Sequence, residues 1–135
     1  GLHLCYGDPG HKHIVEPKNS EVLVALANGI SASTIRGLNW IHMPVPRERV
    51  DDEYYAALAD LKLDIGCTLF LGLVHFTDSD DGAFERISAA RKVVTNFGIA
   101  TECGFGRRPV DTVVPLLQLH QRCSKMIETE VPDAG

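Results

Sequence analysis

The chain has 135 residues, of which 44% are hydrophobic and 23% are charged, and its formal net charge at pH 7 is −5. These proportions are typical of one globular domain, so we expect a single domain over residues 1–135. The negative charge argues against a nucleic-acid partner, which needs a basic surface. No apolar run reaches the roughly 18 residues that span a bilayer, so we expect no membrane partner either.

The four cysteines lie far apart in a chain rich in aliphatic residues: Cys5, Cys67, Cys103 and Cys123. This spacing differs from the dense disulfide framework of small secreted domains. The first residues also lack the basic flank and long apolar core of a signal peptide. We therefore expect a reduced, cytoplasmic protein.

Strands and helices alternate along the predicted chain. In order, we expect strand 2–6, a helix from residue 19 or 20 to about 29, strand 38–43, a helix capped by Asp51, strand 67–75, a helix from about 79 to 94, strand 97–103 and a last helix near 113–127. Strand 67–75 is almost continuously apolar, which is typical of a parallel strand covered on both faces. In the third helix the apolar stripe excludes Arg86, which we expect outside the core.

Four strand–helix units predict an α/β fold with a parallel sheet and helices packed outside it. Four such units make half of an eight-stranded (β/α)8 barrel, and alone they leave two open sheet edges. We therefore predict the carboxyl-terminal half of a TIM barrel, completed by a missing half or by a second copy of the chain. A small doubly wound domain remains the alternative.

His3 and Cys5 are two residues apart in a predicted strand, so their side chains point to the same face. Cys103 lies at the end of another predicted strand. Imidazole nitrogen and thiolate sulfur are ligands of tetrahedral Zn²⁺, and three protein ligands leave one position open for a substrate. The simpler alternative is that the cysteines only pack in the core.

Other polar side chains also follow strands, among them His42 and His75. Ligands of parallel α/β folds gather at the carboxyl ends of the strands, so we place the functional site there. His13 and Glu16, in the loop after the first strand, either line this pocket or face water. We expect Glu102 to point away from its neighbour Cys103 and to be structural, which requires a cationic partner if it is buried.

Three segments carry a resemblance to a known family: His3-Leu4-Cys5-Tyr6, His75 after a later strand, and residues 101–108, Thr-Glu-Cys-Gly-Phe-Gly-Arg-Arg. Together they resemble the carboxyl-terminal barrel of cobalamin-independent methionine synthases, within the superfamily that those enzymes share with uroporphyrinogen decarboxylases. The similarity covers nearly the whole chain and corresponds to strands five to eight of that barrel.

The resemblance implies a zinc ion that holds a substrate thiol as a thiolate nucleophile. By position, His3, Cys5 and Cys103 match zinc ligands of the family. His75 matches a catalytic histidine that acts as acid or base near the methyl donor. The implied partners are a small-molecule thiol and a methyl or alkyl donor, with methionine biosynthesis as the family's setting.

The chain departs from the family pattern at the end of the second predicted strand. Methionine synthases supply a glutamate ligand there, whereas residues 40–44 contain no acid. His42 is the nearest replacement as fourth ligand. Alternatively, His42 lines the pocket and a water molecule, His11 or Glu16 completes the coordination.

We assign substrate binding to two pairs of residues. Asp8 and His11 lie in the loop after the first strand, and Arg107 and Arg108 lie beside Cys103. The two arginines can neutralise a substrate carboxylate or phosphate, or merely face water.

The leading hypothesis is therefore zinc-dependent methyl or alkyl transfer to a thiol. Two alternatives remain open. One is a metal-binding or assembling half-barrel without catalysis. The other is a metal-free, decarboxylase-like lyase in which Arg107 and Arg108 hold substrate carboxylates.

Overall fold

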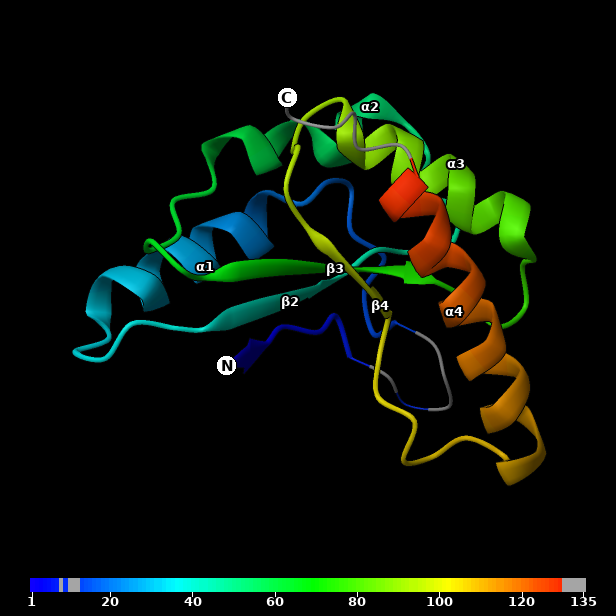
Figure 1. The fold of residues 1–135 in the computed structure, drawn as a ribbon. Helices are drawn as coiled ribbons and strands as arrows, with labels where there is room; N and C mark the ends of the chain where they lie inside the picture. The colour runs from blue at the N-terminus through cyan, green and yellow to red at the C-terminus, as the bar shows by residue number, and fades with distance from the viewer. Residues whose placement is uncertain (8, 10–12, 130–135) are drawn as a thin grey trace.

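A computed structural model of the chain describes residues 1–7, 9 and 13–129. Within these residues one four-stranded sheet has the order β1-β2-β3-β4, and every neighbouring pair is parallel (Figure 1). The strands are β1 (Leu2–His3), β2 (Trp40–Pro44), β3 (Thr68–Val74) and β4 (Gly98–Thr101). The predicted α/β fold with a parallel sheet is confirmed.

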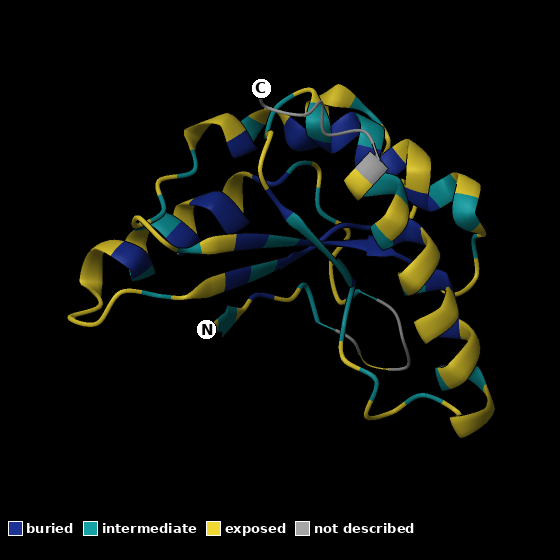
Figure 2. Cartoon of the chain, in the orientation of Figure 1, coloured by how far each residue is buried: buried dark blue, intermediate teal, exposed yellow. Residues whose placement is uncertain are grey.

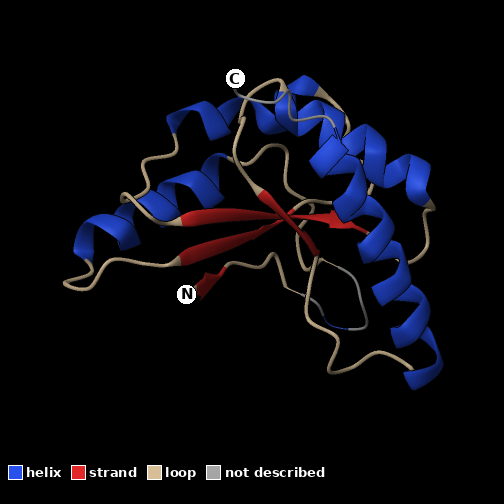
Figure 3. Cartoon of the chain, in the orientation of Figure 1, coloured by secondary structure: helices blue, strands red, loops and turns tan. Residues whose placement is uncertain are grey.

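The helices follow the strands in the predicted order. They are α1 (Glu21–Ser33), α2 (Asp52–Tyr55) with its 3₁₀ continuation η2 (Ala56–Asp60), α3 (Asp80–Arg91), the 3₁₀ turn η3 (Val110–Thr112) and α4 (Val113–Thr129). The strands follow one another in sequence order across the sheet. When the connections in such a sheet are all right-handed, every connecting helix lies on the same face. Figure 3 shows the helices gathered on one side of the strands, with loops and the amino-terminal segment on the other.

Burial along the strands reflects this one-sided cover. In β2, Ile41 and Met43 are buried, whereas Trp40 keeps 41% of its surface exposed. In β3 the first residues alternate in the same way, and only residues 71–74 are buried without interruption (Figure 2). The expectation that strand 67–75 is covered on both faces is therefore wrong for its first half. The buried apolar side chains form one cluster between sheet and helices.

The start of α2 agrees with the boundary predicted from the sequence, whereas the end of α1 does not. Asp51 caps α2 as predicted, because its Oδ1 accepts a hydrogen bond from the Tyr54 backbone N–H at 2.9 Å. By contrast, α1 does not end near Gly29 but continues to Ser33. Glycine weakens a helix interior by only about 1 kcal/mol, so tertiary packing of the preceding turns can carry the helix through it.

Arg86 is the clearest correction to the predicted core. It is 1% exposed, and its Nε donates to the Leu73 carbonyl at 2.9 Å. Its two terminal nitrogens contact the Asp78 carboxylate at 2.6 and 3.0 Å. The guanidinium is buried at low cost because acceptors surround it. Asp78 is thus the counter-charge of the buried Arg86 guanidinium.

A glycine in β3 lets the end of β4 approach closely. A Cβ atom on Gly72 would lie 2.7 Å from the Glu102 Cα. Since real Cβ atoms do not approach backbone atoms so closely, only glycine allows this crossing. It brings Glu102 and Cys103 beside the end of β3. Among the described residues, no helix is long and apolar enough to span a membrane.

Candidate metal centre and adjoining cavities

Two cysteines from opposite ends of the chain meet at the carboxyl ends of the outer strands. Cys5 follows β1, Cys103 follows β4, and their Sγ atoms are 3.4 Å apart. His3 joins them: one ligand atom from each of these three residues lies within 4.8 Å of the other two. The predicted association of His3, Cys5 and Cys103 is thus present in the fold. We call these three residues the His–Cys–Cys cluster.

The spacing of the cluster fits a tetrahedral ion. With Zn–S bonds of about 2.3 Å, two sulfur ligands at the tetrahedral angle lie roughly 3.8 Å apart. The observed 3.4 Å between the sulfur atoms is close to this value. The donor set, one imidazole and two thiols, is also the one that zinc prefers. The cluster therefore fits Zn²⁺ with three protein ligands and one open position.

His42 contacts the cluster through His3. Strand register pairs these two residues across β1 and β2, and their Nδ1 atoms are 2.9 Å apart. Burial, reinforced by the neighbouring His3, lowers the pKa of His42 to about 4, although contact with the Thr101 backbone opposes this shift. His42 does not belong to the group whose ligand atoms all lie within 4.8 Å. Its role as fourth ligand stays a prediction, and in this geometry it orients His3.

His75, the predicted acid or base, follows β3 directly and is 8% exposed. Its Nε2 lies 2.8 Å from the Val45 carbonyl oxygen. Because a carbonyl only accepts, Nε2 carries the proton and Nδ1 is left as an acceptor in the neutral ring. Burial, helped by the positive charge of Arg86, lowers the pKa of His75 to about 4. At neutral pH the ring is therefore uncharged.

Glu102 lies between two histidines. Its Oε1 is 2.5 Å from His13 Nε2, and its Oε2 is 3.7 Å from His75 Nδ1. The other ring nitrogen of His13 is 3.0 Å from Glu16 Oε2. Burial opposes a charge on His13, but these two carboxylates outweigh it and raise the pKa of His13. His13 is thus the cationic partner that a buried Glu102 was expected to need.

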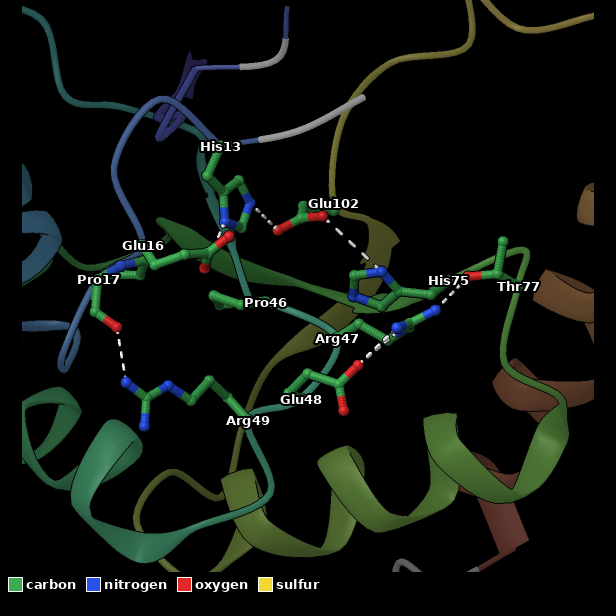
Figure 4. Close-up of a pocket in the computed structure, with 10 residues that line it drawn as sticks. All are labelled: His13, Glu16, Pro17, Pro46, Arg47, Glu48, Arg49, His75, Thr77 and Glu102. Carbon is green, nitrogen blue, oxygen red and sulfur yellow. Dashed lines mark hydrogen bonds and ion pairs between the residues drawn. The ribbon is translucent and has the colours of Figure 1, made fainter. Parts of the chain in front are cut away.

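A large cavity of about 610 Å³ opens over these groups (Figure 4). His75 and Glu102 form one wall, and His13 and Glu16 form another. The segment after β2 supplies Pro46, Arg47, Glu48 and Arg49. Both arginines are engaged: Arg47 contacts Glu48, and Arg49 contacts Asp51 and the Pro17 carbonyl. The sequence alone does not mark this segment as part of a site, because charged residues beside prolines resemble an ordinary exposed turn.

A small cavity of about 230 Å³ adjoins the large one. The two share three lining residues, namely His75, Thr77 and Glu102. Cys103, Gly104 and Arg108 line only the small cavity. A member of the His–Cys–Cys cluster and the buried histidine therefore open onto the same space, as the predicted site requires.

The four residues assigned to substrate binding have different outcomes. Arg108 lines the small cavity, whereas Arg107 is exposed and is not among the lining residues of either cavity. Asp8 and His11 lie outside the described residues. Their assignment therefore stays a prediction.

No protein-family model, no curated protein and no solved structure matches this chain. The class of protein is consequently defined by geometry alone. It is a parallel α/β domain with a His–Cys–Cys cluster and a buried neutral histidine at the carboxyl ends of its strands.

Proposed function

We propose that the protein takes part in zinc-dependent transfer of a methyl or alkyl group to a small-molecule thiol. One observation carries this proposal: Cys103 of the His–Cys–Cys cluster and the buried His75 line the same small cavity. The resemblance to cobalamin-independent methionine synthases names the same groups for the same chemistry. The two experiments described below test whether this chain has that activity.

His3, Cys5 and Cys103 would hold the ion through one nitrogen and two sulfur atoms. Zinc, when bound, supplies a positive charge that lowers the pKa of a coordinated thiol, so that the thiol reacts as a thiolate at neutral pH. The side chains of the cavity then position the donor against that sulfur. Binding both reactants in one cavity lowers the activation free energy, because the loss of translational and rotational entropy occurs on binding and not in the reaction step.

His75 handles the proton in this proposal. Its Nε2–H remains on the Val45 carbonyl, so Nδ1 is the atom that takes or gives a proton. The Glu102 carboxylate, 3.7 Å from Nδ1, stabilises the imidazolium when Nδ1 is protonated. The proton lost by the thiol and the proton needed by the leaving group can both pass through this atom.

The fold also supports the half-barrel part of the proposal. The strand order is sequential, all helices lie on one face, and β1 and β4 each leave one edge unpaired by the described residues. A doubly wound sheet would instead reverse its strand order and carry helices on both faces. We therefore propose half of a (β/α)8 barrel, completed by a second half or by a second copy of this chain. The four free thiols support a reducing, cytoplasmic setting.

The first test is the zinc content of protein purified without added metal. We expect nearly one zinc per chain in the unmodified protein and a loss of at least tenfold in Cys5→Ser and in Cys103→Ser, because each variant removes a thiolate ligand. Cys67→Ser is the matched control, since Cys67 lies outside the cluster. Full zinc content in both cluster variants would refute the metal centre.

The second test separates catalysis from metal binding alone. At pH 6, where free thiols are protonated, zinc-loaded protein should accelerate S-methylation of a small thiol by a simple methyl donor such as methyl iodide. The Cys103→Ser variant should not. Stoichiometric zinc without any acceleration would favour the non-catalytic half-barrel, and acceleration without zinc would favour a metal-free enzyme.

A further inference from the structure

The two thiols of the His–Cys–Cys cluster lie directly against each other. Their Sγ atoms are 3.4 Å apart, which is closer than the roughly 3.8 Å between two sulfur ligands of one zinc ion. A disulfide bond is about 2.05 Å long, so the sulfur atoms of Cys5 and Cys103 need to approach by only about 1.4 Å. The fold thus brings together two cysteines that are 98 positions apart in the chain.

The backbone beside this thiol pair has room for that approach. Cys5 follows the end of β1 and Cys103 follows the end of β4, so neither residue lies within a strand of the sheet. Gly104 comes directly after Cys103, and even a Cβ atom there would meet no other atom within 4 Å. Closing the bond therefore requires a shift of two strand ends and no change in the packed core.

The two thiols differ in their access to solvent. Cys5 is exposed, whereas Cys103 is half-buried beside it. Thiol–disulfide exchange requires that the attacking sulfur reach a disulfide in solution. Cys5 meets this requirement, and Cys103 is placed to attack Cys5 afterwards. An exposed thiol next to a second, resolving thiol is the arrangement of redox-sensing cysteines.

We propose that Cys5 and Cys103 form a reversible disulfide bond when a small-molecule disulfide such as glutathione disulfide oxidises the protein. The Cys5 thiolate attacks one sulfur of glutathione disulfide, and the first glutathione leaves as a thiolate. Cys103 Sγ, as a thiolate, then attacks Cys5 Sγ, and the second glutathione leaves as a thiolate. Two electrons pass from the cysteine pair to glutathione disulfide, which is reduced to two thiols.

Oxidation and zinc binding exclude each other at this cluster. Zinc binds cysteine as the thiolate, and a disulfide sulfur is not a thiolate. Oxidation therefore removes two of the three protein ligands, and each disulfide bond formed releases one zinc ion. This coupling rests on the proposed function, whereas formation of the disulfide bond in metal-free protein does not. Its consequence is that the zinc-dependent activity is confined to reducing conditions.

The first experiment treats metal-free protein with glutathione disulfide and counts the thiols after unfolding. The count should fall from four to two, and dithiothreitol should restore it. The four cysteines lie in four different tryptic peptides, so mass spectrometry identifies the pair. We expect one cross-link, between the peptides of residues 1–12 and 93–107. Glutathione that remains attached to Cys5 would overturn the proposal, because it would show that Cys103 does not reach Cys5.

Cys67→Ser is the matched control, because Cys67 lies outside the cluster. It should form the same cross-link as the unmodified protein, whereas Cys5→Ser and Cys103→Ser should form no cross-link within the chain. Oxidation of the unmodified protein in urea should give a mixture of cross-links, because the fold no longer holds the two thiols together. The same mixture from folded protein, or a cross-link between two chains, would overturn the proposal.

The second experiment adds glutathione disulfide to zinc-loaded protein and follows released zinc with a colorimetric chelator. We expect one zinc ion for every two thiols lost, and renewed zinc binding after reduction. Loss of both thiols with zinc retained would refute the coupling. A protein that binds no zinc but forms the Cys5–Cys103 bond would refute the proposed function and support the redox pair.

Discussion

At the level of single residues, the environment of His75 determines its chemistry. The Val45 carbonyl selects the protonated nitrogen, and burial keeps the ring neutral. Val45 comes directly after β2, one strand away from His75 in the sheet. Position after a strand marked His75 as a candidate, but only the packing of two strand ends shows which nitrogen faces the cavity.

His75 should make stability depend on pH. Its pKa is about 4 in the fold and about 6.5 in an unfolded chain, so the unfolded chain binds a proton first as the pH falls. Its contribution is complete above pH 6.5 and decreases between pH 6.5 and 4. We expect about 2 kcal/mol of this dependence between pH 7 and pH 5.

Urea unfolding at both pH values, compared with His75→Gln, would measure that dependence. The raised pKa of His13 acts in the opposite direction, but it is common to both proteins and cancels in the comparison. A variant with the same pH dependence as the unmodified protein would contradict the assignment of a neutral His75.

At the level of elements, two features determine how neighbouring elements meet. One is the buried pair of Arg86 and Asp78, which ties α3 to the end of β3 through the Leu73 carbonyl. Gly82 makes room for it, since a Cβ atom there would overlap the Asp78 carboxylate. The helical pattern of apolar residues predicted that Arg86 lies outside the core. Such a pattern depends only on which residues are polar and carries no information about the acceptors that surround a side chain in the fold.

Breaking this pair should be costly. Asp78→Asn leaves the Arg86 cation buried without its counter-charge, and loss of one partner of a buried pair destabilises by about 3 to 5 kcal/mol. Asp80→Asn is the control: it breaks the exposed pair with Arg122, which should cost less than about 1 kcal/mol. Thermal unfolding of both variants would measure the difference, and equal losses would contradict the buried role of Arg86.

The second feature is the close crossing of β3 and β4 at Gly72. Gly72→Ala should displace the end of β4, because the new Cβ would overlap the Glu102 backbone. We expect lower stability and weaker zinc binding, since Cys103 follows directly. Gly29→Ala is the control: its Cβ meets no atom within 4 Å in α1, and alanine there should stabilise by about 0.5 to 1 kcal/mol. Unchanged zinc affinity in Gly72→Ala would show that the crossing does not position Cys103.

At the level of the whole molecule, the open sheet is the dominant feature. Apolar side chains are exposed on the first and last helices, at Val22 and Leu26 in α1 and at Val114 and Leu117 in α4. Of these two helices, α4 packs against the edge strand β4, where a further half of a barrel would pack. The exposed surface and the open edges therefore favour completion by additional strands.

The solution mass of the purified chain tests self-completion. A dimer in sedimentation equilibrium is expected if two copies close one barrel, because parallel pairing of β4 with the partner's β1 satisfies both edges at once. A stable, folded monomer at micromolar concentration would rule out self-completion and leave a separate second half. Replacement of Leu117 by Lys should weaken the dimer if this surface is buried in it.

The sequence by itself determined the succession of elements and the parallel sheet. Apolar runs and helical spacing are local signals, and right-handed connections leave few ways to arrange them. The sequence also predicted that the side chains of His3, Cys5 and Cys103 lie close together, because the carboxyl ends of parallel strands lie at the same end of the sheet.

Only the tertiary structure decided the protonation and pairing of the side chains at the site. The contact of Glu102 with His13, the burial of Arg86, the tautomer of His75 and the different surroundings of Arg107 and Arg108 all depend on residues distant in the chain. Such pairings follow from the exact approach of loops and strand ends, which no local pattern encodes. Electrostatic and hydrogen-bonding roles vary steeply with distance and burial, and for that reason they emerge only when the fold is complete.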